Sequence, residues 1–137
     1  MVKKATVAFI LIFLIMQISS CTSKTNNQEY IIRFYKTFNE STGELSEPTE
    51  TIKTGRTEYV LFDYGKPFNS SSIGMTVYED LDGERGSVYD IIDTVEPDAT
   101  AVVFPIEIAN AGKYELVIYF ESPDEPIATT RLYVVDR

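Results

Sequence analysis

The side chains that most often carry out catalysis are scarce in this sequence of 137 residues. Histidine is absent, and Cys21 is the single cysteine. Because histidine is the commonest general base and metal ligand, its absence argues against Ser-His and Cys-His nucleophile pairs and against a zinc site. A carboxylate pair could hydrolyse a glycosidic bond, but this chemistry needs a deep cleft, which small secreted all-β domains rarely build. We therefore expect a protein that is not an enzyme and that uses no cofactor.

The densest group of candidate metal ligands lies in one short acidic stretch. Glu79, Asp80, Asp82 and Glu84 are grouped around Gly83, and Ca²⁺ prefers about six to eight oxygen ligands gathered by a tight turn. The stretch lacks the third acid and the closing glutamate of an EF-hand loop, and an Asp-Gly pair is typical of a hairpin turn. We expect an ordinary solvated turn, with Asp80, Asp82 and Glu84 as candidate calcium ligands and no other metal site.

The single cysteine follows a segment with the layout of a secretory signal peptide. Lys3 and Lys4 form a basic start, an apolar run extends from Ala5 to Ile18, and small residues lead to Cys21. The apolar run is shorter than the roughly 18 to 20 residues that span a bilayer. The order of basic, apolar and small residues therefore predicts a leader that directs secretion.

The residues Ile18-Ser19-Ser20-Cys21 resemble the lipobox of bacterial lipoproteins. The resemblance implies that residues 1–20 are a lipoprotein signal peptide, that a peptidase cleaves before Cys21, and that lipid such as palmitate is attached to its sulfur. Several acyl chains on one residue would exceed the two signals that stable membrane anchoring requires. Thr22 stands where enteric lipoproteins retained in the inner membrane carry Asp, which favours the outer membrane or the cell surface. The alternatives are an ordinary signal peptide that leaves a free thiol, or an uncleaved anchor.

Charge and length restrict what the remaining chain does. Without residues 1–20 it has 10 basic and 21 acidic side chains, a net charge of −11. This charge argues against nucleic acid or anionic lipid as a partner, because both need a basic surface. A lipidated Cys21 would leave no cysteine for a disulfide, so the fold must depend on its core. Residues 21–28 are polar and predict a tether, and residues 29–137 have the length of one domain.

The hydrophobic pattern of this domain alternates with a period of two, which is typical of β-strands. Strands are predicted over residues 29–38, 57–64, 73–79, 87–95, 99–108, 113–121 and 128–136. Residues 39–55 are polar and predict a loop with at most a short edge strand at 50–53, and residues 80–86 predict a charged turn. Pro105 directs its strand to a sheet edge or a bulge. This spacing predicts an antiparallel sandwich or barrel.

The run Asn110-Ala111-Gly112-Lys113-Tyr114 resembles the tyrosine corner of immunoglobulin-like sandwiches. Gly112 would turn the backbone after Asn110, and the Tyr114 hydroxyl would hydrogen-bond to the backbone at the corner. Leu116 stands where antibody domains carry their second cysteine, so the chain is similar to disulfide-free immunoglobulin-like or fibronectin type III-like domains of bacterial surfaces. The resemblance implies an all-β fold, a single antiparallel immunoglobulin-like β-sandwich over residues 29–137. Another small sandwich or a barrel is the alternative.

The same alternation predicts an outward surface on the last strands. If alternate residues from Tyr114 to Phe120 point inward, then Val117 and Tyr119 point outward. Tyr and Arg are enriched at interface hot spots, which makes one outward set the candidate binding face: Tyr78, Tyr119, Arg131 and Tyr133. Cross-strand aromatic pairs also stabilise sheets without binding anything, and this alternative stays open.

Two functional hypotheses follow, with a purely structural subunit as a third alternative. The first is a lipid-anchored protein of the bacterial cell envelope whose domain is a non-catalytic module that binds a protein or a glycan. Fold alone carries no activity, so this rests on analogy with the family. The second is an envelope-tethered inhibitor or exclusion factor that acts through an acidic loop. Salt-sensitive binding of a basic partner would favour the second hypothesis, and salt-tolerant, aromatic-driven binding the first.

Overall fold

The structure of the protein, a computed structural model, describes residues 30–81 and 84–137. The predicted signal peptide, Cys21 and the predicted tether lie outside the described residues, as do Asp82 and Gly83. What the sequence implies for those positions therefore stays a prediction.

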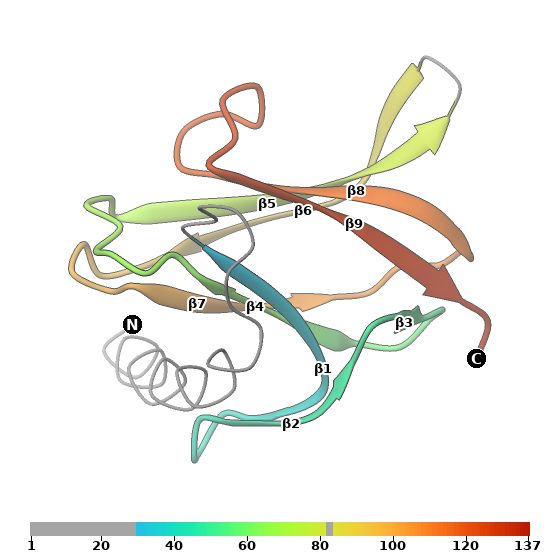
Figure 1. Ribbon diagram of the computed structural model, residues 1–137, viewed down its shortest axis with the longest axis horizontal. Helices are drawn as coiled ribbons and strands as arrows, with labels where there is room; N and C mark the ends of the chain where they lie inside the picture. The colour runs from blue at the N-terminus through green and yellow to red at the C-terminus, as the bar shows by residue number, and fades with distance from the viewer. Residues whose placement is uncertain (1–29, 82–83) are drawn as a thin grey trace.

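The described residues form β-strands and turns, with no helix among them. The strands are β1 Ile31–Asn39, β2 Glu44–Thr49, β3 Ile52–Lys53, β4 Glu58–Asp63, β5 Ser72–Leu81, β6 Glu84–Thr94, β7 Ala101–Ile106, β8 Gly112–Tyr119 and β9 Ala128–Val135. They make a four-stranded sheet in the order β2-β1-β4-β7 and a five-stranded sheet in the order β3-β9-β8-β5-β6 (Figure 1). The two sheets lie face to face, so the predicted β-sandwich is confirmed and a single closed barrel is not formed.

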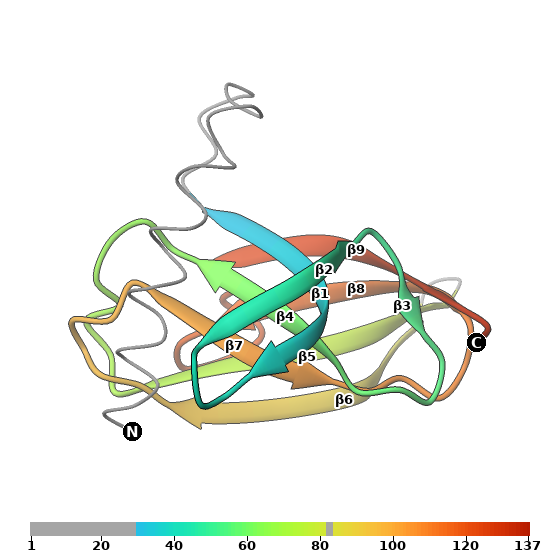
Figure 2. The ribbon, with the colours of Figure 1, turned by 90° about the horizontal axis from the view of Figure 1, so that it is seen from below.

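The connections between the sheets give the sandwich its Greek-key topology. The chain makes a short excursion from the four-stranded to the five-stranded sheet through β3, then crosses between β4 and β5, returns between β6 and β7, and crosses again between β7 and β8 (Figure 2). Strands β4 and β7 therefore pair in one layer and β5, β8 and β9 in the other, as in immunoglobulin-like sandwiches. The pairs are antiparallel except that β3 runs parallel to β9.

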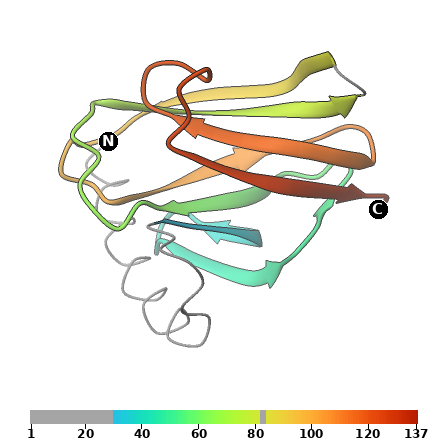
Figure 3. The same cartoon turned by 45° about the horizontal axis from the view of Figure 1, so that its top comes forward.

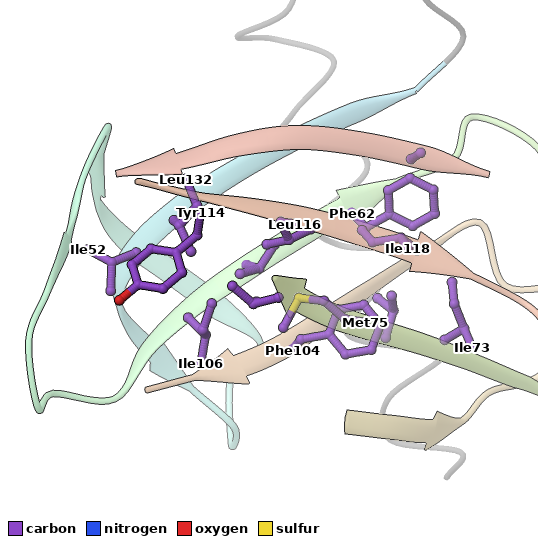
Figure 4. Packing of buried hydrophobic residues seen from close by; sticks show 14 of the residues in the cluster. Ile52, Phe62, Ile73, Met75, Phe104, Ile106, Tyr114, Leu116, Ile118 and Leu132 are labelled. Atoms are coloured by element: carbon purple, nitrogen blue, oxygen red, sulfur yellow. The ribbon is translucent and has the colours of Figure 1, made fainter. Parts of the chain in front are cut away.

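The core fills the space between the two sheets. Alternate residues of the facing strands supply its largest fully buried side chains, among them Phe62 of β4, Met75 of β5, Phe104 of β7 and Leu116 of β8 (Figure 4). Each buried side chain of this size contributes about 1.5–3 kcal/mol relative to an exposed one. The core thus holds the fold together without a disulfide among the described residues.

The order of the strands agrees with the prediction from Pro105. This residue lies in β7, which is the edge strand of the four-stranded sheet, a position where proline is tolerated. The Tyr89 hydroxyl on β6, at the edge of the other sheet, donates to the Pro105 carbonyl oxygen over 2.7 Å. That bond joins the two sheets along one side of the sandwich.

Two of the predicted connections differ from the structure. Residues 39–55 were expected to be a loop with at most a short edge strand at 50–53; β3 is that edge strand, but the segment also contains β2, which pairs with β1 along its length. Most of β2 is exposed, and Leu45 anchors it to a second apolar cluster with Tyr35 and Leu61. Because β2 is an edge strand held by backbone hydrogen bonds and one apolar side chain, its sequence shows little hydrophobic alternation. The expected charged turn at 80–86 is also shorter, because β5 continues to Leu81 and β6 begins at Glu84.

Candidate functional site

The outer face of the five-stranded sheet, which points away from the core, brings together three of the four residues of the predicted binding face. Tyr78 lies on β5, and Arg131 and Tyr133 lie on β9. Glu115 of β8 lies between these strands, directly opposite Tyr78 on one side and Arg131 on the other. The register of three strands therefore places an aromatic ring, a carboxylate and a guanidinium in one row across the sheet.

Arg85 of β6, which lies opposite Asp80, reaches this row with its side chain. Its guanidinium lies over the ring of Tyr78, 4.2 Å from the ring centroid, and forms an ion pair with Glu115. Arginine stacked on an aromatic ring contributes about 0.5–1 kcal/mol at an exposed site, and an exposed ion pair contributes at most about 1 kcal/mol. We call Tyr78, Arg85, Glu115, Arg131 and Tyr133 the outer-face patch.

Sequence reasoning missed Arg85 and Glu115. Arg85 fell in the segment expected to be a turn, whereas the β5–β6 hairpin places it in a strand opposite Asp80. A one-residue irregularity in that hairpin, between Val77 and Tyr78, also shifts which residues of β6 face outward. Neither the length of the hairpin nor this bulge has a clear signal in one sequence.

Tyr119 does not belong to the exposed surface, which corrects the prediction. It lies on the outer face opposite Gly74, but its side chain is only 6% exposed, and its neighbour Val117 is buried as well. A Cβ atom added at Gly74 would lie 2.3 Å from Cζ of Tyr119, so the ring lies directly against the glycine backbone. The ring fills the space that Gly74 leaves empty and is part of the scaffold.

The large hydrophobic side chains that are exposed within the described residues lie on this same face. Tyr133 on β9 and Val88 on β6 are each 42% exposed, and Ile92 on β6 is 70% exposed. Ile92 lies opposite Gly74, an outer-face position, and Val88 lies at the irregularity of the hairpin. Ile92 therefore lies level with the buried Tyr119, whereas Tyr133 lies near the other end of the sheet, opposite Lys113. Of the three, Tyr133 belongs to the outer-face patch, and an exposed tyrosine beside arginine is typical of an interface hot spot.

Between these side chains, the middle of the face is closed by a polar pair. Thr76 of β5 is 1% exposed, and its hydroxyl is hydrogen-bonded to a carboxylate oxygen of Asp90 on β6. The pairing satisfies a buried hydroxyl that would otherwise cost free energy. Thr76 and Asp90 therefore stabilise the sheet, and they lie between the outer-face patch and Ile92.

The residues of the predicted corner adopt a compact local structure at the start of β8. The Tyr114 hydroxyl donates to the Asn110 carbonyl oxygen over 2.7 Å, and the side chain is buried (Figure 4). Gly112 has a φ of 156°, a conformation that L-residues with a side chain rarely adopt. Burial raises the pKa of Tyr114 above its ordinary value of 10.0, and the nearby Glu79 carboxylate raises it further. Tyr114 is a structural residue rather than part of a binding surface.

The side chains of the three candidate calcium ligands lie outside the part of the chain that the structure describes. Asp82 lies outside the described residues, as do the side chains of Asp80 and Glu84, so this candidate stays a prediction. Elsewhere in the described ranges, no three carboxylates or thiols lie close enough to hold a metal ion. Within residues 30–81 and 84–137 there is also no helix that is long and apolar enough to cross a membrane.

Comparison with known proteins supports the fold. No family model matches this chain, and no curated protein matches its sequence. Among solved structures, the chain is similar to the soluble domain of PmoD from Methylocystis sp. ATCC 49242 (Rockwell), with a TM-score of 0.53 and 13% sequence identity. The match covers 82% of this chain and 95% of the PmoD domain. At this identity the likeness shows a shared β-sandwich and carries no function from one protein to the other.

Proposed function

We propose that this protein is a membrane-anchored, non-catalytic binding module of a bacterial cell envelope. Cys21, through its lipobox-like context, would carry the lipid anchor, and the outer-face patch would bind another protein. The observation that carries the proposal is the row of Tyr78, Glu115 and Arg131 across three strands, with Arg85 stacked on Tyr78 and the exposed Tyr133 on the same face of β9 as Arg131. Apolar residues that are exposed singly on a protein surface are common and do not indicate a binding partner.

The charges of the patch favour a protein partner with acidic groups. Arg85 and Arg131 of the patch, together with Lys113, which lies opposite Tyr133, bring three positive charges to this face of an otherwise acidic molecule. Glu115 is paired with Arg85, and no ion pair seen in the described part of the chain includes Arg131. An exposed guanidinium beside Tyr133 is the kind of group that binds a carboxylate in two parallel hydrogen bonds.

Capture from the native envelope tests this surface. The full chain is immobilised through its C-terminus, envelope proteins solubilised in mild detergent are passed over it, and retained proteins are identified by mass spectrometry. We expect one specific protein to be retained and to be lost when Arg131→Ala and Tyr133→Ser are combined. Arg56→Ala, an exposed arginine in the turn between β3 and β4, is the matched control and should retain it.

Two results would contradict the proposal. Retention that is the same for the double variant and for wild type would place the contact elsewhere on the molecule. Retention that is abolished by adding soluble envelope polysaccharide, with no protein lost on Arg131→Ala, would assign the module to a glycan. Circular dichroism of each variant shows whether the β-sheet signal is unchanged, so that loss of folding is not read as loss of binding.

A further inference from the structure

A second candidate site lies at the opposite end of the five-stranded sheet from the outer-face patch. Here the β4–β5 loop and the β8–β9 loop lie at the same end of the sandwich (Figure 3). Between them is a pocket with a volume of about 290 Å³. Its lining consists of Asn69, Ser70, Phe120, Glu121, Glu125 and Ile127. Small-molecule sites have volumes of about 300–1,000 Å³, so this pocket has room for one long side chain or one sugar ring.

The apolar part of the pocket rests on a cluster of aromatic rings. Phe120 packs edge to face against Tyr64, with ring centroids 5.6 Å apart, and against Phe68 at 6.0 Å. Phe68 in turn stacks on the core residue Phe62 at 6.2 Å. The position of Phe120 is therefore fixed by the core, and its ring offers a rigid apolar surface to a ligand.

The loops around the pocket are held by backbone hydrogen bonds. The N–H groups of Phe68 and Asn69 donate to the carbonyl oxygens of Ala99 and Pro97 in the β6–β7 loop, each over 2.8 Å. In the β8–β9 loop, the Ile127 N–H donates to the Ile118 carbonyl oxygen over 2.8 Å. A site whose walls are fixed before binding loses less conformational entropy when it binds a ligand.

The charge of the pocket selects the class of ligand. Glu121 and Glu125 are exposed at its rim, and none of the ion pairs or side-chain hydrogen bonds of the described residues engages either carboxylate. The Lys66 Nζ atom already lies over the ring of Tyr64, which contacts Phe120, at 5.0 Å from the ring centroid. Two carboxylates beside an aromatic ring attract a cation both by charge and by the ring's electron-rich face.

The polar groups fit a sugar less well. Ser70 already donates its hydroxyl to the Ser72 carbonyl oxygen over 2.8 Å and accepts the Ser72 N–H over 3.3 Å. Ionised carboxylates accept hydrogen bonds but donate none. A sugar could donate hydroxyl protons to the carboxylates, but Asn69 is the side-chain donor left in the lining for its many acceptor oxygens, whereas an arginine or lysine side chain supplies donors alone.

We infer that this pocket binds the arginine or lysine side chain of a basic peptide segment, with the aliphatic stem against Phe120 and Ile127 and the cation between Glu121 and Glu125. This site shares no residue with the outer-face patch, whose two arginines and single carboxylate are less favourable for the same cationic ligand. The inference does not depend on the proposed function, because the residues that line the pocket are not part of the outer-face patch.

The test uses the full chain in non-ionic detergent and an acetylated tri-arginine amide as the probe. Isothermal titration calorimetry measures its affinity for wild type and for the Glu121→Gln, Glu125→Gln double variant. We expect the double variant to bind about tenfold more weakly, because close charge pairs dominate such contacts. The matched control is Glu44→Gln with Glu50→Gln, two exposed carboxylates at the other sheet, which changes the net charge equally and should leave the affinity within about twofold.

A second probe separates a specific site from general attraction to an acidic protein. The same peptide with citrulline in place of arginine keeps its shape and loses its charge, and we expect it not to bind. Phe120→Leu should weaken tri-arginine binding severalfold at unchanged charge. Equal losses in the pocket variant and in the Glu44/Glu50 control would overturn the inference, as would unchanged binding by the pocket variant. Saturable binding of a neutral sugar that is lost in the Phe120→Leu variant would assign the pocket to a glycan instead.

Discussion

The glycine at position 74 explains why Tyr119 is buried although it lies on the outer face of the sheet. Tyr119 lies on the outer face, as its position in the strand predicts, yet the absence of a side chain at Gly74 lets its ring lie flat and buried across the strand. Aromatic residues that cover a cross-strand glycine stabilise a sheet in this way. Tyr119 therefore contributes to the stability of the fold, and Tyr133 to the accessible surface.

Substitution of Gly74 tests this interpretation. Gly74→Ala places a methyl group against the Tyr119 ring, and overpacking of this kind costs about 1–3 kcal/mol of unfolding free energy. In a Tyr119→Ser background the same substitution should cost far less, since the clashing ring is gone. Urea unfolding of the four proteins measures this coupling. Additive effects of the two substitutions would show that the ring does not depend on Gly74.

The tyrosine corner makes a second prediction at the scale of one residue. Tyr114→Phe keeps the ring and removes the hydroxyl that donates to Asn110, which should lower the free energy of unfolding by about 1–3 kcal/mol. The urea midpoint at neutral pH measures this change. An unchanged midpoint would mean that the corner contributes nothing to the fold.

The buried tyrosines also predict how stability changes at alkaline pH. Burial raises the pKa of Tyr35, Tyr89 and Tyr114 above the ordinary value of 10.0 in the folded protein. Above pH 10 the unfolded chain therefore loses these protons before the folded one does, so the unfolding free energy falls as pH rises. The slope for Tyr114→Phe should be shallower, because one proton no longer contributes. Chemical denaturation of wild type and Tyr114→Phe between pH 8 and 11 measures how steeply the unfolding free energy falls with pH. Equal slopes for the two proteins would contradict the prediction.

At the scale of the strands, alternation was a good guide wherever a strand buries one face against the core. The strands β4, β5, β7, β8 and β9 lie where the pattern predicts them, because Phe62, Met75, Phe104, Leu116 and Leu132 must point inward. The pattern failed for β2, whose binding to β1 depends on backbone bonds and on Leu45. Residues that lie opposite each other, such as Glu115 and Arg131, follow from register, which the sequence of one strand does not contain.

The same reasoning explains why only part of the candidate site was predictable. Tyr78, Arg131 and Tyr133 were found because outward positions follow from alternation once the inward set is known. Arg85 was missed since it depends on the length of the β5–β6 hairpin and on its bulge. The pocket was missed because it is built by two loops that are about 50 residues apart in the chain, and loop packing leaves no periodic signal.

At the scale of the whole molecule, the described domain begins at the end that carries the pocket. Ile31 at the start of β1 pairs with Asp63 at the end of β4, and the Tyr30 hydroxyl reaches Thr129 at the start of β9. The C-terminus and the tyrosine corner lie at the other end (Figure 1). A lipid anchor at Cys21 would thus join the domain at its pocket end.

The anchor itself is tested by fractionation. Cys21→Ala removes the sulfur to which lipid would be attached, so the protein should leave the membrane fraction or accumulate as uncleaved precursor. Cys21→Ser, which keeps the size of the side chain and still lacks the thiol, should behave in the same way. Immunoblots of separated membrane and soluble fractions measure the change. Either variant, if processed normally and still found with the membrane, would show that lipid on Cys21 is not the anchor.

The central claim is that the outer face of the five-stranded sheet contacts a protein partner in the envelope, and site-specific photo-crosslinking in living cells tests it most directly. A photoreactive phenylalanine replaces Tyr133 on the outer face or, as control, Glu44 on the other sheet. We predict one discrete crosslinked product from position 133, lost when Arg131→Ala is added, and none from position 44. No product from position 133, or the same product from both positions, would contradict the claim.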